Sequence, residues 1–304
     1  MEVTVTGASG LIGRALVSAL LARGERVTVL SRDPERANLP VGVNTERWDP
    51  LSEPAPAGAL EGRDAVLHLA GEPVAQRWSE TAKQAIRDSR VTGTANLLAG
   101  LRALGPADRP GLLISSSAIG YYGAHGIEPI DEEAPAGEGF LAEVCEDWES
   151  AARAAGELGA RTVQLRTGVV LDRDGGALAK MLPPFRLGLG GPVAGGRQYV
   201  AWIHLDDVVG MMLAALSDER WSGPFNATAP EPATNRELSH ALGAALHRPA
   251  ILPVPGLALR VLYGEMAEIV TAGVRAVPAK ALVLGYQFTH QELGEALLAA
   301  LRRA

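Results

Sequence analysis

The first twenty residues place a short apolar strand, three spaced glycines and an apolar-faced helix directly one after another. Val3 and Val5 alternate with threonines, which is typical of a strand with a buried face. Beyond Gly7, apolar residues recur at helical spacing: Leu11, Ile12, Ala15, Leu16, Ala19 and Leu20. A strand, a glycine turn and a helix in this order predict the first unit of a dinucleotide-binding sheet.

The three glycines of this turn have separate expected roles. Gly7 permits the tight turn, Gly10 lets a pyrophosphate approach the backbone, and Gly13 lets the helix lie close to the strand. Free N–H groups at the helix start, with Ser9 and Leu11 among the donors, then attract phosphates together with the helix dipole. The alternative is an ordinary strand–helix turn that binds nothing.

The second predicted strand, residues 26–30, ends at a hydroxyl and a guanidinium, Ser31 and Arg32. Enzymes that prefer NAD have an acidic residue here, which binds the ribose 2′-hydroxyl. A guanidinium suits a phosphate by its charge and its forked donors. We therefore predict NADP as cofactor, with Ser31 and Arg32 on the 2′-phosphate. The alternative is that Arg32 is an exposed charge in a polar loop.

A further buried strand is predicted in residues 64–71, where the chain runs into small residues. Ala70 and Gly71 leave room for the adenosine side of a cofactor, whereas His68 is interpreted as a core strand residue. Residues 79–104 follow with a long helical pattern that includes Arg90. An exposed position is the default expectation for an arginine on such a helix.

Three consecutive hydroxyls follow the predicted strand at residues 111–115. Ser115, Ser116 and Ser117 would lie at the carboxyl end of a parallel strand, which is where such sheets bind ligands. We therefore expect these serines at a ligand site, with Ser115 on its cofactor side. The alternative is that these serines cap the strand end.

The second half of the chain continues the pattern and then changes in composition. A helix is predicted over 141–155, strands over 161–171 and 200–204, and Asp206 is expected to cap the next helix. The glycine-rich residues 187–196 are either a flexible connection or a mobile wall over a substrate. Two capping boxes, Thr234 to Glu237 and Thr289 to Glu292, each predict a helix start.

Together these elements predict an α/β fold: a Rossmann-type, doubly wound parallel sheet with a smaller, mainly helical C-terminal domain. We expect residues 1–175 to form the dinucleotide-binding domain, with residues 198–228 returning to it. Residues 176–197 and 229–304 would form a substrate-binding cap over the carboxyl edge of the sheet.

Composition narrows the functional classes. A chain of 304 residues with 47% hydrophobic residues can bury a sizeable core, and a net charge of −7 disfavours nucleic-acid binding. One cysteine, Cys145, excludes an internal disulfide and fits a reducing compartment, so we expect a cytoplasmic protein without a signal peptide. No membrane-spanning run and no metal site are predicted, and the oligomeric state is left open.

Several motifs make the chain resemble the extended short-chain dehydrogenase/reductases, in their NAD(P)-dependent epimerase/dehydratase branch. These are Gly7-Ala-Ser-Gly-Leu-Ile-Gly13, Ser115-Ser-Ser-Ala118, Arg166 to Val170 and Ile203-His-Leu-Asp-Asp207. Further motifs resemble the YfcH-like epimerase family proteins, which carry a C-terminal domain of unknown function: Ser31-Arg32, Leu69-Ala-Gly-Glu72, Arg77-Trp78, Ser117 to Gly123, Pro184 to Gly191, Trp202-Ile-His204 and Leu284-Gly-Tyr286. The likeness runs over nearly the whole chain.

The resemblance implies a set of NADP-binding residues in the first half of the chain. They are Gly7, Ser9, Gly10, Leu11, Ile12, Gly13, Ser31, Arg32, Leu69, Ala70, Gly71 and Arg90, with Val170 near the nicotinamide.

The superfamily's chemistry uses a tyrosine followed four residues later by a lysine, whose charge lowers the phenol pKa. None of the five tyrosines in the chain has lysine at that spacing. If Glu149 aligns with the family's helix glutamate, the two catalytic positions fall on Leu141 and Cys145. Neither residue can replace the pair, although a thiolate at Cys145 is an alternative to a buried, inert thiol.

Other residues could take over part of the chemistry. Ser117 matches the serine that binds the reacting oxygen of the substrate in this family. Tyr121 or Tyr122 is the candidate substitute acid, and aromatic packing is the alternative for both. His204 is expected to orient a loop rather than transfer protons.

The sequence therefore leaves hypotheses of different classes. The first is an NADP(H)-dependent oxidoreductase or epimerase-like enzyme that acts on an unidentified small molecule. The second is a non-catalytic NADP(H)-binding sensor or regulatory protein, since the catalytic pair is missing. The third, a structural protein that has lost its cofactor, conflicts with the complete glycine turn.

Overall fold

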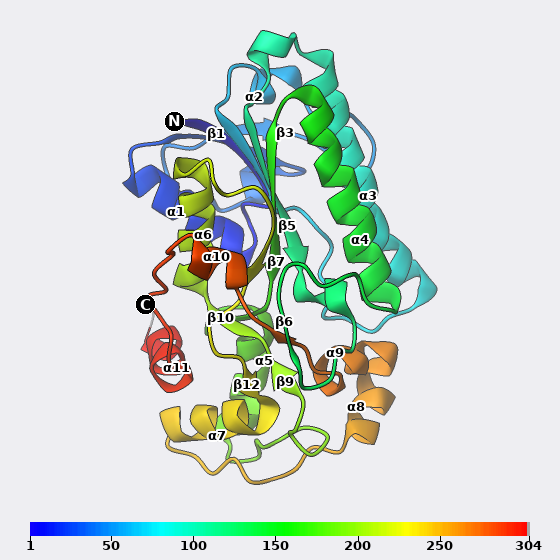
Figure 1. Ribbon diagram of the computed structural model, residues 1–304, viewed down its shortest axis with the longest axis vertical. Coiled ribbons are helices and arrows are strands. Elements are labelled where there is room, and N and C mark those ends of the chain that lie inside the picture. The colour runs from blue at the N-terminus through cyan, green and yellow to red at the C-terminus, as the bar shows by residue number, and fades with distance from the viewer. Residues whose placement is uncertain (303–304) are drawn as a thin grey trace.

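The computed structural model describes residues 1–302 and is built on a seven-stranded parallel sheet (Figure 1). The strand order is β11-β7-β5-β4-β1-β2-β3. The strands are β1 (Glu2–Thr6), β2 (Arg26–Ser31), β3 (Asn44–Arg47), β4 (Ala65–His68), β5 (Leu112–Ala118), β7 (Arg161–Thr167) and β11 (Gly223–Ala227). Because the chain winds outward in both directions from β1, the doubly wound fold predicted from the sequence is confirmed.

Helices cover both faces of this sheet. On one face lie α1 (Leu11–Ala22) and α6 (Leu205–Ser217), and on the other lie α3 (Glu80–Ala103) and α4 (Phe140–Arg153) (Figure 1). The first face buries Val3, Val5, Leu16, Leu20, Val208 and Met211, and the second buries Val66, Leu97, Leu101, Leu113 and Ala152. These two apolar layers account for most of the burial that stabilises the fold.

Below the carboxyl ends of the strands lies a smaller layer of helices (Figure 1). It contains α5 (Gly176–Arg186), α7 (Asn235–Ala245) and α11 (Leu293–Arg302), which share an apolar core of leucines and Phe185. The remaining elements are α2 (Ala57–Leu60), α8 (Gly256–Tyr263), α9 (Ala267–Thr271), α10 (Ala279–Val283), β6 (Pro129–Ile130), β8 (Val169–Leu171), β9 (Tyr199–Val200), β10 (Trp202–His204), β12 (Ala233–Thr234) and β13 (Arg275–Ala276). Between α7 and α11 the chain returns to the main body, where Ala281 and Phe288 pack into the core of the first face.

The predicted strand over 161–171 is divided in two. The chain leaves the main sheet at Gly168, and β8 pairs with β10 instead. A β-carbon at Gly168 would lie 2.2 Å from the backbone oxygen of Ala201, so the two segments cross in direct contact there. Periodicity alone does not show this crossing, because the residues on both sides of Gly168 have strand-like patterns and only the contact with Ala201 separates them.

Two helix starts also differ from expectation. The prediction that Asp206 caps α6 is wrong: the cap is His204, whose Nδ1 accepts the Asp206 N–H at 3.1 Å. The capping box predicted at residues 289–292 does not form either, since α11 begins at Leu293 and the amides of Thr289 and His290 donate to Asp207. In contrast, the capping box at the start of α7 is confirmed.

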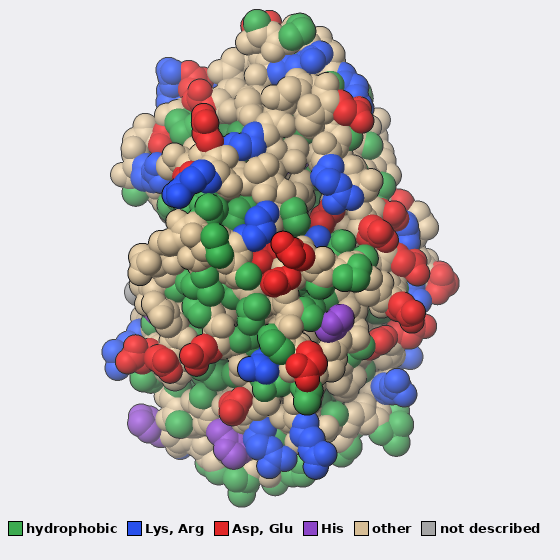
Figure 2. Space-filling model, viewed as in Figure 1, with side chains coloured by type: hydrophobic (Ala, Val, Ile, Leu, Met, Phe, Trp, Pro, Cys, Tyr) green, Lys and Arg blue, Asp and Glu red, His purple; other side chains and the backbone are tan. Residues whose placement is uncertain are grey.

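Acidic and basic side chains are interspersed over the face of the molecule in Figure 2, with apolar side chains between them. Across the described residues, no helix is both long enough and apolar enough to cross a membrane.

Candidate functional site

The glycine turn between β1 and α1 is packed so closely that side chains cannot be accommodated. Gly7 has φ +70°, and a β-carbon there would lie 2.6 Å from the backbone of Leu69. A β-carbon on Gly13 would lie 2.3 Å from the oxygen of Gly7. The turn after β1, the turn after β4 and the first turn of α1 therefore form one compact backbone surface.

The amino end of α1 opens onto this surface without a side-chain cap. Its N-cap is Gly10, and no acidic residue lies in its first turn. The amides of Leu11, Ile12 and Gly13 are the helix donors that have no partner within the helix. An uncapped helix N-terminus has free N–H donors and the positive end of the helix dipole, and Gly10 leaves its backbone accessible. These features fit the pyrophosphate of a dinucleotide.

Thr6, the last residue of β1, ties the turn after β4 to this site. Its Oγ1 accepts the amides of Leu69 at 3.1 Å and Ala70 at 3.2 Å, and lies 2.8 Å from His68 Nδ1. Since the hydroxyl accepts both amides, its own proton is directed at the imidazole. Burial lowers the pKa of His68 to about 4, so the ring is neutral and belongs to the core, as the sequence suggested. Sequence reasoning missed Thr6, whose only signal is a hydroxyl just before the glycine turn.

Ser31 and Arg32 lie beside the glycine turn, because Leu30 pairs with Thr6 across β1 and β2. Ser31 is half-buried and Arg32 is exposed at the edge of the sheet. Nearby, the amide of Leu51 and the Ser52 hydroxyl lower the pKa of Asp49, and the charge of Arg32 adds to this effect. The guanidinium is therefore exposed at the carboxyl edge of the sheet, beside the glycine turn.

Arg90 is not the exposed helix charge that is the default for an arginine. Its Nη1 donates to the carbonyls of Glu72 and Ile86, both at 3.0 Å, and its guanidinium lies 5.0 Å from the ring centroid of Trp148. A β-carbon on Gly71 would lie 3.3 Å from that guanidinium. The Arg90 guanidinium therefore packs against the turn that follows β4 and supports it.

At the end of β5, the serine expected to act in catalysis is part of a buried ion network. Ser117 is buried, and its hydroxyl donates to Glu149 Oε1 at 2.8 Å. The same carboxylate accepts Nε and Nη2 of Arg166 at 2.8 and 2.9 Å. The Ser117 hydroxyl donates its proton to Glu149, so toward any other partner its oxygen can only accept a hydrogen bond.

Tyr122 belongs to the same network. Its hydroxyl donates to Asn226 Oδ1 at 2.7 Å and accepts Arg166 Nη1 at 2.9 Å. Burial is the main cause that raises the pKa of Tyr122 to about 12. A fully buried phenol with both hydrogen-bonding directions occupied favours the packing role over the substitute acid.

Tyr121 is placed differently from Tyr122. It is half-buried, and the Arg166 guanidinium lies 3.5 Å from its ring centroid. Its ring meets the ring of Tyr122 edge-on, with centroids 5.3 Å apart. Of the two tyrosines, Tyr121 is therefore the one that keeps contact with the surface at the end of β5.

Leu141 and Cys145, to which the sequence comparison would assign the catalytic pair if Glu149 is the family's helix glutamate, lie on α4 beside this network. Leu141 is half-buried and Cys145 is buried. Desolvation raises the pKa of the Cys145 thiol to about 12, so the inert thiol is favoured over the thiolate. Sequence reasoning missed the roles of Arg166 and Glu149 in holding Ser117, since the partners come from different strands and helices.

The network continues to the edge of the sheet through Glu132. This buried carboxylate accepts the amides of Asn226 at 2.9 Å and Lys280 at 3.2 Å. Both Glu132 and Lys280 line a depression of about 310 Å³ between α10 and the residues that follow β6. The C-terminal segment is thus linked to the main sheet by polar contacts as well as apolar ones.

The remaining predicted residues lie around the same edge. Ser115 is buried next to His68 in the strand pairing, and its hydroxyl donates to the Ser116 carbonyl at 3.1 Å. Val170 is half-buried on β8 and packs against the first core. The structure therefore gathers the glycine turn, the end of β2, the turn after β4 and the end of β5 at the carboxyl edge of one sheet.

Comparison with known proteins agrees with this arrangement. The model of the NAD dependent epimerase/dehydratase family matches residues 3–227, and that of a domain of unknown function matches residues 254–300. The chain belongs to the NAD-dependent epimerase/dehydratase family. The resemblance drawn from the sequence motifs is thereby confirmed, including the C-terminal domain.

Individual members of this family match the chain over its whole length. An epimerase family protein of Mycobacterium bovis is 43% identical and aligns with 97% of this chain and 96% of its own. The human epimerase family protein SDR39U1 is 39% identical, with 98% of both chains aligned. A crystal structure of human SDR39U1 with NADPH has a TM-score of 0.89 at 36% identity and covers 100% of both chains.

Proposed function

We propose that this family member binds NADP(H) at the carboxyl edge of its sheet. The observation that carries the proposal is the uncapped amino end of α1, which faces a glycine turn with no space for side chains. Gly7 to Gly13 would hold the pyrophosphate, and Leu69 to Gly71 the adenosine side. The NADPH in the structure of human SDR39U1 supports this assignment.

Ser31 and Arg32 would select the phosphorylated cofactor. No acidic residue stands at the end of β2, and the exposed guanidinium of Arg32 suits a 2′-phosphate. Reversing this charge tests the selection directly. In Arg32→Glu, NADPH affinity should fall at least tenfold while NADH affinity is retained, as measured by calorimetry. Arg36→Glu, an exposed change in the same loop, is the matched control, and an unchanged preference in Arg32→Glu would refute the selection.

We further propose that the protein is an oxidoreductase or epimerase-like enzyme acting on a small molecule. A bound nicotinamide supplies hydride chemistry, and the protein contributes binding and orientation. Ser117 would accept a hydrogen bond from the substrate, with Tyr121 beside it. Residues 176–197 and 229–304 would act as the substrate-binding cap.

A specific observation favours a second candidate, a non-catalytic NADP(H)-dependent sensor. Ser117 and Tyr122 are held in a buried ion network, and no tyrosine of the chain has a lysine four residues later. A sensor predicts NADPH binding without turnover and a partner whose affinity changes with the cofactor.

A substrate screen that follows NADPH absorbance separates the two candidates. Turnover that is lost in Ser117→Ala and Tyr121→Phe but kept in Tyr122→Phe would support the enzyme, with Ser117 and Tyr121 at its reacting centre. Turnover that is indifferent to Ser117 would remove this mechanism. Binding of NADPH without turnover of any carbonyl or nucleotide-sugar substrate would favour the sensor.

A further inference from the structure

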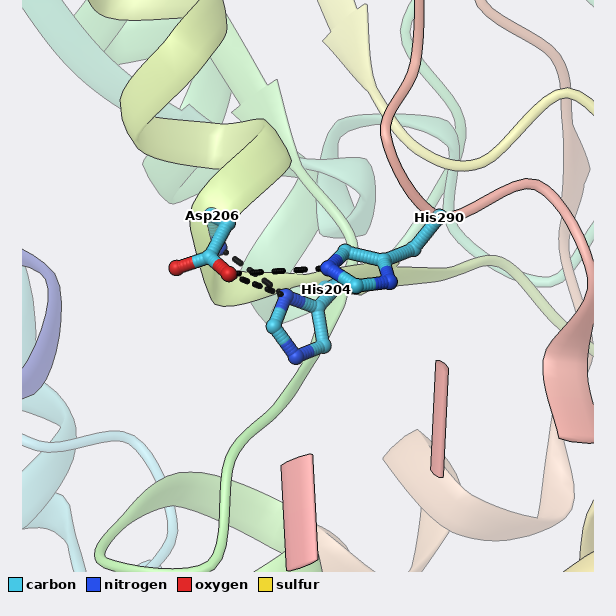
Figure 3. A group of neighbouring side chains, drawn as sticks. All are labelled: His204, Asp206 and His290. Carbon is cyan, nitrogen blue, oxygen red and sulfur yellow. Dashed lines mark hydrogen bonds and ion pairs between the residues drawn. The ribbon is translucent and has the colours of Figure 1, made fainter. Parts of the chain in front are cut away.

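His204, Asp206 and His290 converge at the start of α6 (Figure 3). His204 ends β10 and Asp206 lies in the first turn of α6, whereas His290 comes from the segment just before α11. One potential ligand atom from each side chain lies within 4.8 Å of the other two. The cluster therefore joins the part of the chain matched by the epimerase family to the part matched by the domain of unknown function.

The third side chain is held in place by its backbone. Asp207 is buried, and its carboxylate accepts the amides of Thr289 at 2.7 Å and His290 at 3.0 Å. The Tyr286 hydroxyl also donates to the Asp207 carbonyl at 3.1 Å. The backbone at His290 is thereby anchored, and its imidazole lies over that of His204, with ring centroids 3.8 Å apart. Preorganised side chains of this kind need little reordering to bind a ligand.

Two of the three separations between these groups match what a tetrahedral metal ion requires, and the two imidazole nitrogens lie within 4.8 Å of each other. Asp206 Oδ2 lies 3.4 Å from His204 Nδ1 and 3.5 Å from His290 Nε2. Bonds of about 2.0–2.2 Å from zinc to imidazole nitrogen and carboxylate oxygen place tetrahedral ligands roughly 3.3–3.5 Å apart. Figure 3 shows the two imidazoles directed toward the same carboxylate oxygen.

We propose that His204, Asp206 and His290 form a binding site for a divalent transition metal ion of the zinc type. Two imidazoles and one carboxylate are a ligand set that zinc accepts, with further positions taken by water. Asp206 keeps 48% of its side-chain surface exposed, so an ion can enter from solvent. The bound ion would fasten the segment before α11 to the amino end of α6.

The hydrogen bond at the cap of α6 limits the affinity of this site. His204 Nδ1 already accepts the Asp206 amide, and an ion bound to that nitrogen replaces this bond. The positive end of the helix dipole also opposes a cation. We therefore expect one ion per chain, bound more weakly than in a closed four-ligand zinc site.

Calorimetry with zinc chloride on the full chain, after removal of any affinity tag, tests the site. One ion should bind per chain, and the affinity should fall at least tenfold in His290→Gln and in Asp206→Asn. His240→Gln changes an exposed histidine on α7 and is the matched control, with unchanged binding expected. Circular dichroism of each variant checks that the fold is retained.

Two further measurements are independent of any activity. Co²⁺ should give the visible absorption of a tetrahedral site in the native protein and in His240→Gln but not in His290→Gln. Zinc should raise the melting temperature of the same two proteins only. Absence of stoichiometric binding, binding that survives both ligand variants, or equal loss in His240→Gln would overturn the proposal.

Discussion

Arg166 and Glu149 form a bidentate ion pair beneath the carboxyl end of β5, with N–O distances of 2.8 and 2.9 Å. The side chains of both residues are almost entirely buried, with 3% and 0% exposure. Ser117 and Tyr122 are each bonded to one member of this pair. The end of β5 that carries Ser117 is therefore held rigid by charge pairing.

Removing one member of this pair should destabilise the fold strongly. In Arg166→Met, the buried Glu149 carboxylate loses its partner, and we expect the free energy of unfolding in urea to fall by about 3–5 kcal/mol. Arg220→Met is the matched control, because the Arg220–Asp218 pair is exposed and should lose less than about 1 kcal/mol. Equal losses in the two variants would show that the buried pair is not the main support.

A methyl group on Gly13 should disrupt the proposed cofactor site. Its β-carbon would lie 2.3 Å from the Gly7 oxygen, so α1 must move away from the turn. We expect Gly13→Ala to lower NADPH affinity at least tenfold in fluorescence titrations. Gly111→Ala is the control, because no atom lies within 4 Å of the added carbon. Full affinity in Gly13→Ala would contradict the close packing of α1 against the glycine turn.

The neutral, buried His68 should make stability depend on pH. Its pKa falls from 6.5 in the unfolded chain to about 4 in the fold, so between these values the unfolded chain binds the extra proton. Stability from this group is complete above about pH 6.5 and is lost as the pH falls toward 4, by about 3 kcal/mol in total. Urea unfolding of the native chain and His68→Gln across this range should differ in slope. Parallel curves would rule out this contribution.

Cys145 should be unreactive in the folded protein. Burial raises its pKa to about 12, so almost no thiolate exists at neutral pH. Iodoacetamide at pH 8 should leave the native protein unmodified over hours and should label it fully in urea, as read by intact mass. Rapid labelling of the native protein would restore the thiolate nucleophile as a candidate.

Elements with a local cause were predictable from the sequence. Alternating valines before Gly7 and apolar residues at helical spacing after it indicated β1 and α1 nearly as they are found. The capping box at Thr234 formed because both of its partners lie within one helical turn. For the same reason the spaced glycines were enough to place the dinucleotide-type turn.

The tertiary structure decided what depends on partners distant in the chain. Sequence spacing could not show that Arg166 would bind Glu149, nor that a crossing at Gly168 would divide one predicted strand into β7 and β8. The cap of α6 is His204 and not the expected Asp206. The amides of residues 289 and 290 donate to Asp207, so no helix begins at Thr289. Burial and charge pairing at such contacts arise only after the sheet has brought distant segments together. The periodicity that predicts strands and helices is local, so it can be read from the order of the residues alone.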